Sequence, residues 1–360
     1  MAVIQVDEES PEYKRFAELY KAARALRPNE TDLWEGDLYA TVGEGGWGAF
    51  VPGDGSFKLS KELVLDQLGP DANPHDQVQA LSTILHETNH ARAPVDAPKE
   101  PNAVRSRHSK GLDEGLTEYV AVKDVAVFAA STGYGELPEP KAEYPAAYRA
   151  TDALLEYAAG PEGKDALADR AIDQPVVMRW DAIADEIVRN RLGDVVPQDP
   201  QHQQAARAEL INAMTGPGWR NLDDELPVVG NDVAQATTQS LDDATDRIRE
   251  HYAENPTEPY PSKIPNFEIA NSQAQNLSGP QNRTRAVRPA TPCASSTVRR
   301  PRHRPLSTNP PSATEPAAQA RHRRRARIAQ PRTGRRPPPT AAAADNQRQA
   351  RNDHGPRTVP

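Results

Sequence analysis

The spacing of apolar residues predicts that the chain begins with a helix. From Tyr13 to Leu26, apolar side chains recur every three or four residues, which places them on one helix face. Ser10 and Pro11 precede this stretch as a typical N-cap and first-turn proline, and Pro28 interrupts the pattern. We therefore expect a helix with one buried face between Ser10 and Pro28.

Three short strand-like runs follow at residues 38–42, 49–51 and 57–59, and glycine-rich turns separate them. They predict a small antiparallel meander. The turn at residues 43–48 has the spacing G-x-G-x-x-G, which binds dinucleotides only where a helix follows it. Here a strand-like run follows instead, so we interpret these glycines as a hairpin turn.

The remaining pattern is helical, with Pro and Gly at the joints. Such an order predicts an α+β fold, in which a small sheet and paired helices precede a mostly helical half. Five apolar residues near position 150 are interpreted as helical core: Tyr144, Tyr148, Leu154, Leu155 and Tyr157. Helices are expected at about residues 60–69, 73–91, 112–130, 145–159, 163–173, 176–191, 200–214 and 231–253.

Charge is unevenly distributed between the last 80 residues and the rest. Residues 281–360 hold 18 of the 43 basic residues and three of the 51 acidic ones, so this tail carries +15 and the preceding body −23. The tail also holds 13 of the 35 prolines and no aromatic residue. It cannot bury enough apolar area to offset chain entropy, and we expect it to be disordered.

Three interpretations of the arginine-rich tail stay open. It could bind nucleic acid through phosphate neutralisation, or fold back on the acidic body. It could also be an out-of-frame translation of GC-rich codons, since composition changes abruptly near Gln281. We expect no other contact with nucleic acid, because the body is acidic.

Composition also bounds the class of protein. The only cysteine, Cys293, excludes an intramolecular disulfide and a thiolate metal site. No run approaches the ~18 apolar residues of a transmembrane helix, and no signal peptide is recognisable. We therefore expect a cytoplasmic protein with no membrane partner.

The clearest chemical motif is His86-Glu87-x-x-His90, inside the helix expected at residues 73–91. Histidines four residues apart share a helix face, so both imidazoles can bind one ion. Glu87 lies about 100° around the helix from His86, where a carboxylate can accept a proton from a metal-bound water. The motif predicts a Zn²⁺ site with one ion per chain.

Two segments could supply a third ligand. Asp96 follows His90 by six residues, the spacing of short zincins, but Ala93 stands where those proteins need glycine. Glu114 and Glu118 are the stronger candidates, because they lie one turn apart on the next expected helix. One of them can bind the ion while the other orients a ligand histidine.

The two segments 86–90 and 112–119, read together as H-E-x-x-H and L-D-E-G-x-x-E-Y, resemble gluzincin metallopeptidases of the thermolysin-like and aminopeptidase N-like group. The resemblance covers roughly residues 35–135. It implies a zincin-like fold and an edge strand near 57–59 that pairs with an extended peptide substrate. The roles it implies are zinc ligation by His86, His90 and Glu114, general-base catalysis by Glu87, and support of a ligand histidine by Glu118.

This chain departs from that family at one motif position, where Asp113 replaces the usual asparagine. It also lacks the exopeptidase signature G-x-M-E-N, which favours an endopeptidase. The family needs a donor for the oxyanion of the tetrahedral intermediate. The candidates that we retain are His108, Tyr119 and Tyr148.

The sequence thus predicts a zinc-dependent endopeptidase that acts on peptides or proteins. Two alternatives are a non-catalytic binding protein with a zincin fold and a metallopeptidase effector or toxin-like domain. The expected organisation is a zincin-like metal-binding subdomain at 1–135, a helical subdomain at 136–255, a linker at 256–280 and the tail at 281–360.

Overall fold

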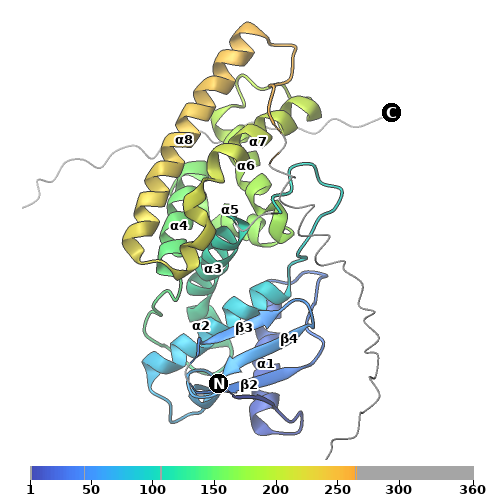
Figure 1. Cartoon of the computed structure of the whole chain (residues 1–360). Coiled ribbons are helices and arrows are strands. Elements are labelled where there is room, and N and C mark those ends of the chain that lie inside the picture. Colours follow the sequence, from blue (N-terminus) through green and yellow to red (C-terminus); the bar gives the residue numbers. More distant parts are fainter. Residues whose placement is uncertain (1, 44, 106–107, 264, 266–360) are drawn as a thin grey trace, which may run out of the picture. The chain divides into compact units, whose positions relative to one another are not determined.

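A computed structural model describes residues 2–43, 45–105, 108–263 and 265 (Figure 1). It has a mixed α+β architecture, as expected, in which a small sheet lies near the N-terminus and helices form the rest of the described chain. The predictions for the tail at 281–360, and for most of the linker at 256–280, lie outside the described residues.

The sheet differs from the predicted antiparallel meander. Its strands are β1 (Ala2–Gln5), β2 (Leu38–Val42), β3 (Gly48–Val51) and β4 (Ser56–Ser60), in the order β1-β2-β4-β3. β4 pairs antiparallel with β3 but parallel with β2, so the sheet is mixed.

This strand order corrects two expectations from the sequence. The glycine segment at 43–48 joins β2 to β3, which do not pair because β4 lies between them, so it is not a hairpin turn. The segment 57–59 lies inside the sheet, and the edge strands are β1 and β3. Pairing beyond neighbouring strands depends on contacts that local alternation does not encode. No helix follows the glycines, in agreement with the exclusion of a dinucleotide loop.

The helices around the sheet begin at the expected residues. α1 (Pro11–Leu26) follows Ser10, whose hydroxyl accepts from the Tyr13 N–H. α2 (Pro74–Ala91) follows Asn73, whose side chain accepts from the His75 N–H. The helix expected at 60–69 is only a 3₁₀ turn, η1 (Leu65–Leu68), because Ser60 still belongs to β4.

The second half is helical, as predicted. α3 (His108–Ser131) packs against both α2 and α4. Between α5 and α6 lies the short 3₁₀ helix η2 (Val176–Met178), and η3 (Pro217–Asp224) precedes α8. The other helices are α4 (Pro145–Ala159), α5 (Lys164–Ile172), α6 (Arg179–Arg191), α7 (Pro200–Met214) and α8 (Pro227–Glu254).

Two large hydrophobic clusters meet along α3. Its first half contributes Leu112 and Leu116 to the cluster of the helical half, whereas Val125 and Phe128 from its second half pack with α1, α2 and the sheet. Leu154 and Leu155 are buried in the helical cluster, which confirms their interpretation as core. The subdomain boundary expected at residue 135 stays a prediction, as α3 joins both clusters.

Within the described residues, no helix has the length and apolar character needed to cross a membrane.

Candidate metal centre

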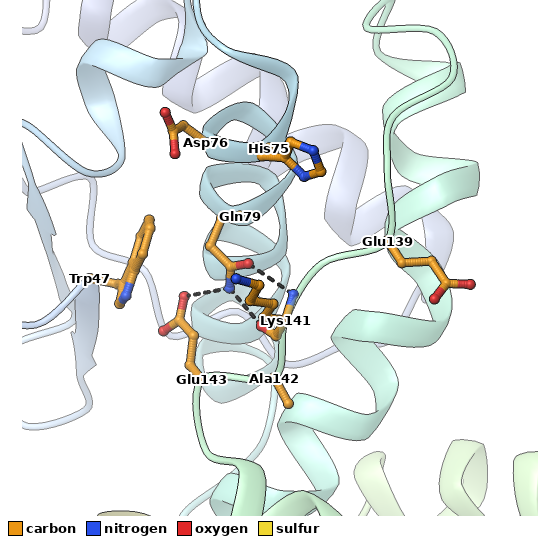
Figure 2. Close-up of a pocket in the computed structure, with 8 residues that line it drawn as sticks. All are labelled: Trp47, His75, Asp76, Gln79, Glu139, Lys141, Ala142 and Glu143. Carbon is orange, nitrogen blue, oxygen red and sulfur yellow. Dashed lines mark hydrogen bonds between the residues drawn. The ribbon is translucent and has the colours of Figure 1, made fainter. Parts of the chain in front are cut away.

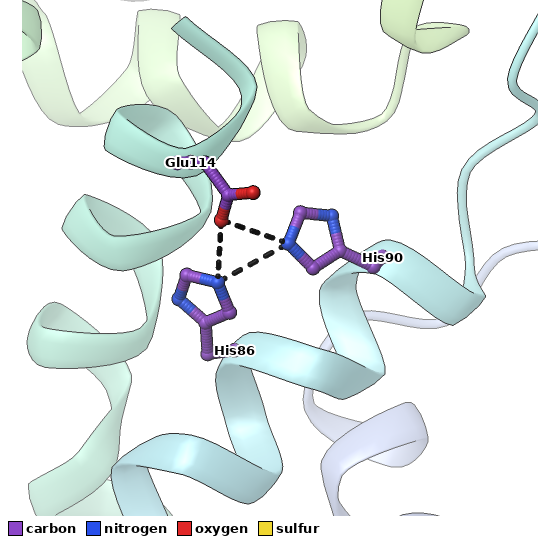
Figure 3. Close-up of side chains that lie close together, drawn as sticks. All are labelled: His86, His90 and Glu114. Carbon is purple, nitrogen blue, oxygen red and sulfur yellow. Dashed lines mark hydrogen bonds and ion pairs between the residues drawn. The ribbon is translucent and has the colours of Figure 1, made fainter. Parts of the chain in front are cut away.

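Two helices bring the candidate ligands together. His86 and His90 lie one turn apart on α2, and Glu114 faces them from α3 (Figure 3). Nε2 of His86 lies 3.1 Å from Nε2 of His90 and 3.2 Å from Oε2 of Glu114, and the third separation, from Nε2 of His90 to Oε2 of Glu114, is 3.5 Å. Three donor atoms thus converge on one point.

The size of this triangle suits a small divalent ion. Four ligands at about 2.0–2.1 Å from a tetrahedral Zn²⁺ are about 3.4 Å apart, and the three separations bracket this value. Two imidazoles and one carboxylate match the donor set that zinc takes in hydrolases. Among the described residues, this is the group of His, Cys, Asp and Glu side chains whose donor atoms lie close enough to hold a metal.

Close packing of α3 against α4 holds Glu114 in place. The neighbouring Gly115 meets α4 so tightly that an added Cβ would lie 2.4 Å from the carbonyl oxygen of Ala147. No real side chain tolerates such a contact, so the glycine of the D-E-G motif is required by helix packing. A larger residue there would move the backbone that carries Glu114.

Each histidine of this group has a carboxylate at its other ring nitrogen. Nδ1 of His86 lies 2.8 Å from Oε2 of Glu118, which is 2% exposed. Nδ1 of His90 lies 3.6 Å from Oδ1 of Asp113, which also binds the buried Arg179 of α6. Such partners fix the tautomer and the orientation of a ligand imidazole. The residue that departs from the family pattern, Asp113, therefore has a defined place beside His90.

The electrostatics of this group favour a positive charge at its centre. Burial alone would lower the pKa of His86, but Glu114 and Glu118 outweigh it and raise that pKa well above its ordinary value. Burial is likewise overcome at His90, where Asp113 and Glu114 raise the pKa to about 10. The pKa of Glu114 is lowered, because the two histidines outweigh its desolvation.

Glu87 is held by the edge strand β3. Its Oε2 accepts from the Phe50 N–H of β3 at 2.6 Å, and the side chain is 4% exposed. This N–H points away from β4, because in the β3–β4 ladder Phe50 lies between the hydrogen-bonded pairs. The Glu87 Oε1 atom makes no hydrogen bond to the described part of the chain, so it can accept one from a water molecule.

Tyr144 lies directly against the metal-ligand group. Its ring centroid is 5.2 Å from that of His86, at an interplanar angle of 33°. Burial raises the pKa of the Tyr144 hydroxyl, and Glu114 and Glu87 raise it further, so the group stays protonated and able to donate. The sequence pattern marks Tyr144 as core, and it does pack against the helical cluster, but it also contacts His86.

The other candidates lie in different surroundings. Asp96 is exposed and pairs with Arg105 at 2.7 Å, away from the ligand group, because α2 ends at Ala91. The Tyr119 hydroxyl donates to Asp165, and its ring stacks on the half-buried Tyr148. His108 is the first residue of α3, about 9 Å along the helix from Glu114, and burial and then Arg220 lower its pKa.

Sequence reasoning missed three contributors to this site. Phe50 acts through its backbone N–H, which leaves no residue-type signal. The backbone N–H of Glu143 donates to Oε1 of Glu118 at 2.7 Å, a contact that again does not depend on the type of side chain at position 143. Tyr144 is recognised only from its contact with His86.

Comparison with known proteins finds no match to this chain among protein-family models, curated proteins or solved structures.

Proposed function

We propose that this chain is a zinc-dependent peptidase of the gluzincin type, with His86, His90 and Glu114 as ligands. The observation that carries the proposal is the triangle of donor atoms beside Glu87, with separations of 3.1, 3.2 and 3.5 Å. When bound, zinc would polarise a peptide carbonyl and lower the pKa of a water molecule. The carboxylates of Glu118 and Asp113 support the two imidazoles.

Glu87 is the proposed general base. One carboxylate oxygen is anchored by Phe50, so the other can take a proton from the attacking water as its oxygen adds to the carbonyl carbon. The same proton is then delivered to the amine nitrogen as the C–N bond breaks. Tyr144 is the proposed donor to the carbonyl oxygen, because its protonated hydroxyl belongs to a ring that packs on His86.

The free edge of β3 is the proposed docking strand for an extended peptide. Gly48 and Phe50 turn their backbone groups away from β4. The Phe50 N–H already donates to the proposed base, so the Gly48 N–H and the carbonyl groups of both residues are the groups that would pair with a peptide. Main-chain pairing with this edge would hold the peptide across the metal site. The pairing with substrate that the sequence predicted for residues 57–59 is therefore proposed for β3.

The test combines metal analysis with turnover of a quenched peptide library. Wild type is expected to hold about one zinc per chain, and a double variant His86→Ala, His90→Ala to hold none. Glu87→Gln should keep the zinc and lose about 10³-fold or more in turnover, since it retains shape but cannot take a proton. The exposed Glu136→Gln serves as the matched control and should match wild type.

Two results would overturn the proposal. A folded wild type without affinity for zinc removes the metal site, and undiminished hydrolysis by Glu87→Gln removes the general base. Tight zinc binding without cleavage of any peptide would favour the non-catalytic binding protein instead.

A further inference from the structure

A cavity of about 440 Å³ lies beside the first half of α2, separate from the three metal-ligand atoms (Figure 2). Its wall comes from three segments: the residue before β3, the N-terminal turns of α2, and the loop between α3 and α4. Trp47, Asp76, Gln79, Glu139, Lys141 and Glu143 are the lining residues that matter for its chemistry.

Hydrogen bonds connect this cavity to the proposed metal centre. The Glu143 N–H donates to Glu118, the partner of His86, and Oε1 of Glu143 accepts from the Thr83 hydroxyl at 2.8 Å. Thr83 lies one helical turn before His86 and Glu87. The lining residue of α2 nearest to the proposed general base is Gln79, which lies about 12 Å along the helix from Glu87.

The edge strand β3 leads from the base to the cavity. Phe50 binds Glu87, and Trp47 lies three residues earlier, which is about 10 Å along an extended chain. A peptide paired with the free edge of β3 would cover the same distance in two or three residues. One of its side chains within three residues of the scissile bond would thus face the cavity.

The wall of the cavity is rigid where it carries Glu143. Gln79 makes two hydrogen bonds with the backbone of Lys141, donating to its carbonyl at 2.8 Å and accepting from its N–H at 3.0 Å. Gln79 also donates to Oε1 of Glu143 at 3.2 Å (Figure 2). The loop is consequently tied along α2, and the position of the Glu143 carboxylate is set by the helix.

The chemistry of the wall suits an extended cation. Its lining holds three carboxyl groups, those of Asp76, Glu139 and Glu143, together with one ammonium group, that of Lys141, and the imidazole of His75. Oε2 of Glu143 has no hydrogen-bond partner within the described ranges. The half-buried indole of Trp47 offers an apolar surface for an aliphatic stem and a face for a guanidinium group. An acidic side chain would meet repulsion here.

We infer that this cavity is a specificity pocket that binds a lysine or arginine side chain of the peptide substrate, with the Glu143 carboxyl group as its principal contact. The inference rests on the proposed peptidase function and names the substrate class of that site. Glu143 contacts the substrate side chain in this arrangement, and Gln79 acts as a positioning residue. The protein's own arginine-rich tail presents the same chemistry as an external peptide.

Cleavage of a peptide library by the zinc-loaded full chain tests the inference. We expect Lys or Arg at one fixed position within three residues of the cleaved bond. For matched peptides with arginine or norleucine at that position, Glu143→Gln is expected to reduce the arginine-to-norleucine ratio of kcat/KM about tenfold. Glu136→Gln removes the same charge from the same loop but lies outside the wall, and it should leave the ratio unchanged.

A measurement of peptide binding tests the pocket without requiring turnover. Zinc-loaded Glu87→Gln is titrated with the same fluorescent peptides, and the arginine peptide is expected to bind about tenfold more tightly than the norleucine peptide. The double variant Asp76→Asn, Glu139→Gln changes only exposed side chains, and it should also reduce the preference for the arginine peptide. It tests the pocket even if Glu143→Gln fails to fold. Mass analysis of the intact chain then reports whether residues 281–360 are cleaved as well.

The outcomes separate the two proposals. Cleavage without preference for a basic residue, or equal affinity for the two peptides, overturns the pocket and leaves the peptidase standing. Absence of cleavage together with selective binding of the arginine peptide overturns the peptidase and leaves the pocket.

Discussion

At the scale of single residues, the proposed metal centre depends on contacts that orient its polar groups. Glu118 holds the ring of His86 through Nδ1, while Tyr144 packs on one face of the same ring. Burial of such groups is costly unless each has a partner, and here the partners are the residues that set the geometry. The ring of His86 is therefore fixed by contacts from both α3 and the start of α4.

The proposed role of Tyr144 can be tested by removing one atom. Tyr144→Phe keeps the ring against His86 but loses the hydroxyl, so we expect zinc content to be retained and kcat to fall about 10²–10³-fold. Tyr148→Phe is the matched control, because that tyrosine is also half-buried on α4 but stacks on Tyr119. The rate of peptide cleavage is measured for both variants. Full activity of Tyr144→Phe would contradict the proposed role of Tyr144, and a loss of activity in Tyr148→Phe alone would assign that role to Tyr148.

At the scale of elements, α3 connects the proposed metal centre to the helical half. Its residue Asp113 lies between His90 of α2 and Arg179 of α6, and Arg179 is 1% exposed. A buried ion pair contributes little net stability, but removing one partner leaves the other charge unpaired. The helical half is thus coupled to His90 through one carboxylate.

Replacing Arg179 should therefore lower the stability of the protein. Arg179→Ala leaves the Asp113 carboxylate without its cation, and we expect the free energy of unfolding to fall by about 3–5 kcal/mol. The control Arg189→Ala changes the same helix at an exposed position and should cost at most about 1 kcal/mol. Urea unfolding, followed by circular dichroism, measures the free energy of unfolding of both variants. Equal effects of the two variants would show that Asp113 does not need Arg179.

At the scale of the whole molecule, charge separates the acidic body from the arginine-rich tail. The body carries −23 and the tail +15. A strongly negative body attracts divalent cations and basic peptides and repels polyanions. This agrees in sign with the proposed metal centre and with the proposed pocket for a basic side chain.

Deleting residues 281–360 should therefore abolish binding to polyanions. We expect the full chain to be retained on heparin at low salt and to elute as salt rises, because binding releases counterions. The shortened chain should flow through while keeping its zinc, since all three ligands precede the deletion. Retention of the shortened chain on heparin would place a polyanion site on the body.

Local patterns in the sequence were sufficient to predict most of the helices and to identify the chemical motif. The N-caps Ser10 and Asn73 and the first-turn prolines determine where α1 and α2 begin, because these signals act within one turn. The spacing of His86 and His90 likewise places both on one helix face whatever surrounds them. The structure then brings Glu114 to these histidines, the ligand that the sequence favoured over Asp96.

Only the tertiary structure decided which distant segments meet. The strand order that makes β3 an edge strand, the Phe50–Glu87 contact and the packing of Tyr144 on His86 all join residues far apart in the chain. Such contacts depend on how buried surfaces fit together, and the period of a single segment carries no information about its partner. The sequence by itself therefore determined the local elements and the types of ligand, and tertiary packing determined the site that they form.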